Sequence, residues 1–87
     1  MKFEDTYFSR ELRFAVGVEQ QSGKYYLSIP VSNGLVDYDE YYELDPATYE
    51  RFIEDHAAAS DFAIQCRRHE KDDLLIMKPG SNRGVAI

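Results

Sequence analysis

The residues best able to do covalent chemistry are Cys66 and His69, which lie three positions apart in the chain. In a helix this spacing places a thiol and an imidazole on one face, and the neighbouring Arg67 and Arg68 would favour the thiolate. Nucleophilic catalysis also needs a third group that orients the base, and the sequence offers none. We therefore interpret Cys66 as a partly buried structural cysteine near the basic end of a helix, and we predict no catalytic residue and no enzyme.

Paired carboxylates are the second candidate for chemistry. Asp37 and Asp39 alternate along one predicted strand, which places both on the same face about 7 Å apart. Glycosidases use carboxylates at such separations, but they also need a substrate cleft, and 87 residues offer little material for its walls. We expect both side chains to be solvated at the surface.

Metal and phosphate sites have weaker support. His56 and His69 are thirteen residues apart, and no Cys-x-x-Cys or His-x-x-x-His spacing occurs. The tail segment KPGSNRG contains glycines and two cations, but it lacks the spacing of a phosphate-binding loop and precedes no helix. We predict a plain turn there, no metal site and no cofactor, and we expect His56 to border the apolar side of a helix.

The elements that would position these residues begin with strands. Residues 11–19, ELRFAVGVE, alternate with a period of two, which predicts a half-buried strand. After the turn residues QQSG, residues 24–31 (KYYLSIPV) form a second predicted strand and residues 35–44 (LVDYDEYYEL) a third. Asn33 and Gly34 lie between the last two, and Asn-Gly is typical of a two-residue type I′ hairpin turn.

The register of both hairpins follows from these turns. The QQSG turn pairs Val16 with Leu27, and the two-residue Asn-Gly turn pairs Ile29 with Tyr38. The apolar faces of the three strands then coincide, and a slip of one residue would break that agreement. Glu40 is the one misfit on the apolar face, and we expect it near the sheet edge or displaced by a bulge.

A helical region follows the strands. The dipeptide Asp45-Pro46 predicts a helix start, because aspartate accepts hydrogen bonds from free backbone N–H groups and proline suits the first helical position. Apolar residues then recur at helical spacing, and residues 46–68 form either one bent helix or two helices, the second capped by Ser60. Residues 73–78, DLLIMK, predict a last strand, and residues 84–87 a further short strand or a frayed end.

The order of these elements predicts a single α+β domain over residues 1–87. An antiparallel meander of three to four strands would carry one or two helices on its apolar face. The predicted core residues are Phe14, Val16, Leu27, Ile29, Tyr38, Phe52 and Ile53.

The other face of the sheet and the start of the helix form the predicted binding surface. Residues 37–55 contain eight acidic residues and one base, Arg51, a formal charge of −7, and several tyrosines. Such a surface suits fast, salt-sensitive capture of a basic protein. Alternatively, water or the N-terminal segment with Phe3, Tyr7 and Phe8 covers this face. The residues predicted to contact a partner are Tyr26, Asp37, Asp39, Tyr41, Glu43, Glu50 and Glu54.

The overall charge narrows the class of partner. The net charge is −6, which opposes binding to nucleic acid or to an anionic membrane, because both attract basic proteins. No run approaches the roughly 20 apolar residues of a membrane span. A single cysteine and no signal peptide are typical of a protein in a reducing cytoplasm, which is the predicted location.

The run YYLSIPVSNGLVDYDEYYELDPATYERF, a hairpin leading into a capped helix, resembles small bacterial immunity proteins of polymorphic or contact-dependent toxin systems. Size, acidity and the single cysteine are similar as well. The resemblance implies a cytoplasmic inhibitor that binds a basic toxin domain, often a nuclease, and blocks its active site. The alternative is a small accessory or regulatory domain without catalytic activity. Such a domain would form homo-oligomers, for example a homodimer through an open sheet face or edge.

Overall fold

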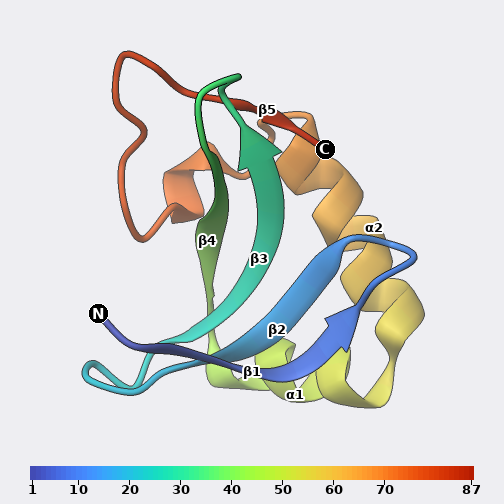
Figure 1. The fold of residues 1–87 in the computed structure, drawn as a ribbon. Helices are drawn as coiled ribbons and strands as arrows, with labels where there is room; N and C mark the ends of the chain where they lie inside the picture. Colours follow the sequence, from blue (N-terminus) through green and yellow to red (C-terminus); the bar gives the residue numbers. More distant parts are fainter.

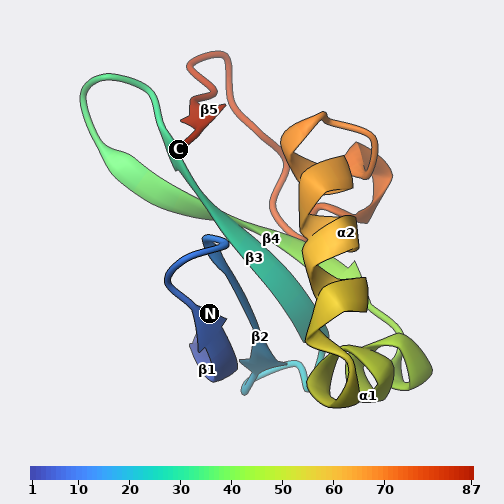
Figure 2. The ribbon, with the colours of Figure 1, turned by 90° about the vertical axis from the view of Figure 1, so that its right-hand side faces the viewer.

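An antiparallel sheet carries two helices on one of its faces (Figures 1 and 2), and this α+β arrangement confirms the predicted fold class. The computed structural model describes residues 1–87. The strands run in the order β1-β2-β3-β4, and a short β5 pairs with the end of β3. The elements are β1 (Phe3–Ser9), β2 (Phe14–Glu19), β3 (Tyr25–Ser32), β4 (Asp37–Leu44), α1 (Pro46–Glu54), α2 (His56–Arg67), the 3₁₀ turn η1 (Asp72–Leu74) and β5 (Val85–Ala86).

The hairpin of β2 and β3 has the predicted register, with Val16 opposite Leu27. Its turn is fixed by Glu19, the last residue of β2, whose side chain is only 1% exposed. The Glu19 carboxylate accepts hydrogen bonds from the backbone N–H groups of Lys2 (2.7 Å), Gln21 (3.0 Å) and Ser22 (2.8 Å). These bonds, that from Lys2 first, lower the pKa of Glu19 from 4.5 to about 2.

The hairpin of β3 and β4 differs from the prediction by two residues in register. Ile29 lies opposite Glu40 instead of Tyr38. The connection is longer because the Asn33 side-chain oxygen accepts hydrogen bonds from the backbone N–H groups two and three residues later (3.0 and 2.9 Å). The predicted two-residue turn is therefore wrong, and β4 starts two residues later than expected. A shift of two keeps every side chain on its predicted face.

The N-terminal segment forms a strand that the sequence pattern did not predict. β1 pairs antiparallel with β2 through a bulge between Asp5 and Tyr7. Before the bulge, Phe3 lies on the face away from the helices and stacks on Tyr41 (ring centroids 3.6 Å apart). After it, Tyr7 lies on the helix side and stacks on His56 (3.7 Å). The alternative in which this segment covers the outer face is thus correct for Phe3.

The helical region is two helices, each with an aspartate at its start. The Asp45 carboxylate accepts a hydrogen bond from Thr48 N–H (2.7 Å), as predicted for the first cap. Asp55 ends α1, where its N–H donates to the Arg51 carbonyl (2.7 Å), and its carboxylate accepts from the N–H three residues later in α2 (3.2 Å). The second helix therefore begins before Ser60, the cap expected from the sequence.

The predicted strand over residues 73–78 is wrong. This segment contains η1, a single bridge between Leu75 and Tyr42, and a hydrogen bond from Ile76 N–H to the Tyr41 carbonyl (2.9 Å). A short apolar run does not distinguish a strand from another buried segment, and here it serves mainly to place Leu75 in the core. The predicted short strand near the C-terminal end is present as β5.

The core lies between the sheet and the helices. Five of the seven predicted core residues are buried, and Tyr38 and Ile53 are half-buried against them. The buried core cluster comprises Phe14, Val16, Leu27, Ile29, Val31, Tyr42, Leu44, Phe52, Ala59, Ala63, Cys66 and Leu75.

Candidate protein-binding face

Five of the seven predicted contact residues share the sheet face that is turned away from the helices: Tyr26 on β3 and four residues of β4. The four residues of β4 alternate along the strand, so their side chains point the same way. Glu50 and Glu54 lie on α1, which packs on the opposite face, so the structure does not bring all seven residues together. We use the name acidic outer face for Asp5, Asp37, Asp39, Tyr41 and Glu43.

Tyr26 supports this face from below. Its ring is fully buried, edge-on to Phe3 (5.3 Å) and Tyr41 (5.0 Å), and its hydroxyl donates a hydrogen bond to the Asp5 carboxylate (2.5 Å). Gly17 on β2 leaves the room for the Tyr26 hydroxyl, because a Cβ there would lie 2.6 Å from its oxygen. Tyr26 therefore offers no free surface to a partner, although it was predicted to contact one.

Asp5 and Asp39 place two carboxylates close together on the acidic outer face. Burial raises the pKa of Asp39, the charge of Asp5 raises it further, and a hydrogen bond with Tyr41 lowers it. Burial and then the Asp39 charge raise the pKa of Tyr41 to about 12, so this hydroxyl remains a donor at neutral pH. Neither carboxylate is in an ion pair, because the three ion pairs of the structure join other residues. No ion pair within the chain therefore neutralises either of these two carboxylates.

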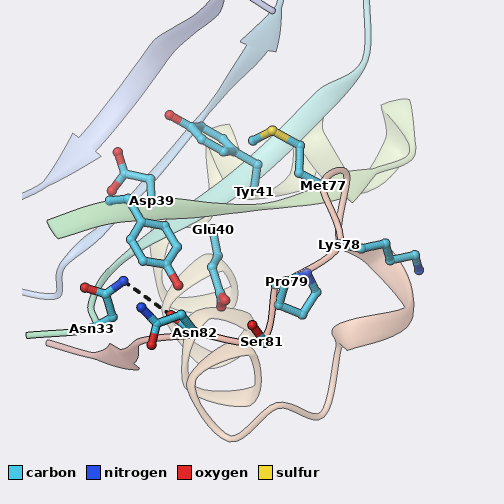
Figure 3. Close-up of a pocket in the computed structure, with 11 residues that line it drawn as sticks. Asn33, Asp39, Glu40, Tyr41, Met77, Lys78, Pro79, Ser81 and Asn82 are labelled. Carbon is cyan, nitrogen blue, oxygen red and sulfur yellow. Dashed lines mark hydrogen bonds between the residues drawn. The ribbon is translucent and has the colours of Figure 1, made fainter. Parts of the chain in front are cut away.

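A hollow of about 430 Å³ adjoins the acidic outer face between β4 and the loop 77–82 (Figure 3). One wall is the strand from Tyr38 to Tyr41, and the other is the loop. At one end the Asn33 side-chain amide donates a hydrogen bond to the Asn82 carbonyl (3.3 Å). The hollow is therefore bounded along both sides and at this end.

A second hollow, of about 270 Å³, also includes Asp39 in its lining. Asp5 lies on its wall, and the turn between β1 and β2 contributes two arginines, Arg10 and Arg13. The floor contains Ser28, which is buried. Asp39 thus borders two depressions, and the outer face is not flat at the place where its carboxylates gather.

Glu40, the misfit on the apolar side, lies on β4, which is the edge strand of the sheet as expected, and no bulge displaces it. It lies in the middle of β4, 6% exposed, and pairs with Arg83 through two hydrogen bonds (2.8 and 3.0 Å). Arg83 also holds Asp72 (2.8 and 3.0 Å) and lowers the pKa of that carboxyl group. The Tyr42 hydroxyl donates to Glu40 (2.9 Å). This buried network fixes the C-terminal segment behind β4.

The cysteine and the two histidines first considered for chemistry do not form a common site. Cys66 is fully buried, and burial raises the pKa of its thiol to about 12. His69 is exposed beyond the end of α2, and His56 is exposed at its start. No group of three or more His, Cys, Asp or Glu residues is placed to hold a metal ion. None of the helices has both the length and the apolar composition needed to cross a membrane.

Comparison of the chain with protein-family models, curated proteins and solved structures finds no match.

Proposed function

We propose that this protein is a binding module that captures a basic protein through the acidic outer face. The observation that carries the proposal is the charge left free there. Of its carboxylates, Glu43 has a cation nearby, Lys24 at 3.6 Å, and both of those side chains are about half exposed, so solvent weakens the pair. The remaining carboxylates form no ion pair within the chain.

The class of protein that fits best is a cytoplasmic immunity protein that inhibits a basic toxin domain. The net charge of −6, the tyrosine beside the carboxylates and the resemblance of residues 25–52 support this class. If the toxin is a nuclease, the carboxylates would engage the lysines and arginines that otherwise hold phosphates.

The partner to test first is a basic toxin-like protein encoded next to the gene for this chain. Association is measured by surface plasmon resonance at two salt concentrations. The wild type should associate faster at low salt, because opposite charges steer the encounter. Asp39→Lys/Glu43→Lys should slow association and flatten its salt dependence, whereas Tyr41→Ala should speed dissociation.

Glu50→Lys/Glu54→Lys is the matched control, because it changes the net charge equally on α1. It should slow association less than the double variant on β4. Association of the wild type that does not respond to salt would refute the electrostatic basis of the proposal. An equal loss in both double variants would show that net charge, and not the acidic outer face, governs binding.

The second candidate is an accessory or regulatory domain that forms homo-oligomers. It is favoured by exposed apolar residues at one end of the sheet, where the loop after β3 lies near β5 (Figure 1). Leu35 is 83% exposed, Val36 58% and Val85 68%, and such a group is typical of an interaction site. Light scattering after size exclusion tests this candidate, since a strict monomer at high concentration would reject it.

A further inference from the structure

The free edge of β4 carries unpaired backbone groups. In an antiparallel ladder the N–H and C=O of alternate residues point to the same side of the strand. The Tyr41 carbonyl points away from β3, because it accepts from Ile76 (2.9 Å). Asp39, two residues earlier, must point the same way. Pro30 lies opposite Asp39, and its carbonyl accepts a hydrogen bond from the Ile87 N–H (3.2 Å) and not from β4. This agrees with the alternation.

This unpaired edge opens into the hollow of Figure 3. The chain pairs with β4 at Leu75 and Ile76, leaves it at Met77, and is held again at Asn82. Between these points the loop forms the far wall of the hollow and makes no hydrogen bond to the backbone of β4. The edge therefore faces a slot that these two contacts flank and that adjoins the acidic outer face at Asp39 and Tyr41.

The slot has the length of a short strand. Successive residues of a strand advance by about 3.3–3.4 Å, so the edge from Asp37 to Tyr41 is about 13 Å long. An extended segment of five residues spans this length from its first Cα to its last. A segment in this place would satisfy the backbone groups of Asp37 and Asp39.

We propose that this slot binds an extended basic segment of the partner as an added strand beside β4. The inference rests on the proposed function and specifies how the partner would bind. Alternate side chains of the added strand would lie on the outer face beside Asp37, Asp39 and Tyr41, where lysine or arginine fits. The intervening side chains would enter the hollow near Tyr38 and Met77, where apolar residues fit.

Charge argues against a second copy of this chain as the added strand. Antiparallel pairing of β4 with itself about Asp39 would put two Asp39 side chains opposite each other, and like charges in that position are destabilising. The register of the Tyr42–Leu75 bridge would place the chain's own Lys78 opposite Asp39. In Figure 3, however, Lys78 points away from β4, so the position opposite Asp39 is open to a cation of the partner.

The test uses the peptide acetyl-Lys-Val-Lys-Val-Lys-amide and amide exchange measured by NMR. The peptide should slow exchange of the Asp39 N–H by about tenfold or more, because a hydrogen-bonded amide exchanges only after opening. Two further peptides carry N-methyl groups on alternate amides, one peptide for each set of alternate positions, so that each blocks hydrogen bonding along one edge of the added strand. Only the peptide whose methylated amides face β4 should lose the protection of the Asp39 N–H. A peptide with glutamate in place of lysine should not bind.

Two variants separate the backbone from the charge. Asp39→Asn removes the carboxylate and keeps the N–H, whereas Asp39→Pro removes both, and proline is tolerated at the free side of an edge strand. Asp39→Pro should bind the peptide several-fold more weakly than Asp39→Asn. If Asp39→Pro does not fold, strand addition is tested by the amide exchange rate of the Asp39 N–H in the wild type, measured with and without the peptide.

The outcomes distinguish this inference from the function on which it rests. Salt-dependent binding without protection of the Asp39 amide, or equal binding by the two Asp39 variants, would overturn strand addition and leave the acidic outer face as a binding surface. Absence of peptide binding at low salt would also overturn strand addition. The proposed function would fail instead if the partner's association does not respond to salt.

Discussion

Replacing Arg83 by methionine should destabilise the protein strongly, because Arg83 neutralises the buried Glu40. The two side chains are 17% and 6% exposed, so solvent screens them little. Methionine keeps an unbranched apolar side chain at the site but leaves the Glu40 carboxylate without a cation. The Tyr42 hydroxyl remains as its hydrogen-bond donor, which does not compensate a buried charge.

The expected loss is a large part of the total stability. Removing one partner of a buried ion pair costs about 3–5 kcal/mol, and a domain of 87 residues is stable by about 4–13 kcal/mol. Glu40→Gln/Arg83→Met should recover at least about 1–2 kcal/mol of this loss, because no buried charge remains and Tyr42 can donate to the glutamine oxygen.

Urea unfolding followed by circular dichroism measures these free energies. Lys24→Met is the matched control, since it breaks the exposed pair with Glu43 and should cost at most about 1 kcal/mol. A loss below about 1 kcal/mol in Arg83→Met, or a double variant less stable than Arg83→Met, would refute the reasoning.

Three further outcomes are expected. Gly17→Ala should lower the free energy of unfolding by about 1–3 kcal/mol, because the new Cβ would clash with the backbone carbonyl of Glu4 and would lie 2.6 Å from the Tyr26 hydroxyl oxygen; Gly80→Ala, which meets open space, is the control, and an equal effect of both would contradict the packing. Backbone hydrogen bonds lower the pKa of Glu19 from 4.5 to about 2, so its contribution to stability is fully present above pH 4.5 and lost as the pH falls towards 2. The urea midpoint of the wild type should therefore fall more over that window than that of Glu19→Gln, and parallel curves would exclude the effect. Because burial raises the pKa of Cys66 to about 12, a thiol reagent at pH 8 should label it only after unfolding; labelling of the folded protein at the rate of a free thiol would count against this.

The sequence was sufficient where side chains alternate without interruption. β2 and β3 have that pattern, and their register and core residues followed from it. The register of β4 was missed because of a local turn. The Asn33 side chain accepts hydrogen bonds from the N–H groups of Leu35 and Val36, so these two apolar residues belong to the turn and not to the strand to which the pattern assigned them. β1 was missed because its bulge after Asp5 breaks the period of two.

The candidate site was predictable in part for the same reasons. The alternation along β4 was enough to place its acidic residues on one face. Asp5 was not found, since it joins them through a strand that was not predicted. Arg83 was not found either, because it lies 43 residues from Glu40 in sequence and no local pattern connects the two. The signal available was Glu40 itself, a carboxylate at a core position that requires a cation.

The junction of the two helices constrains how the length of the chain can vary. Asp55 both ends α1 and caps α2, so no spare residue separates the helices. Each residue of an α-helix turns it by about 100°. An insertion after Asp55 that extended α2 at its start would therefore rotate Ala59, Ala63 and Cys66 away from the sheet or force α2 to shift along its axis. Homologues of this chain should accordingly show hardly any change of length at position 55.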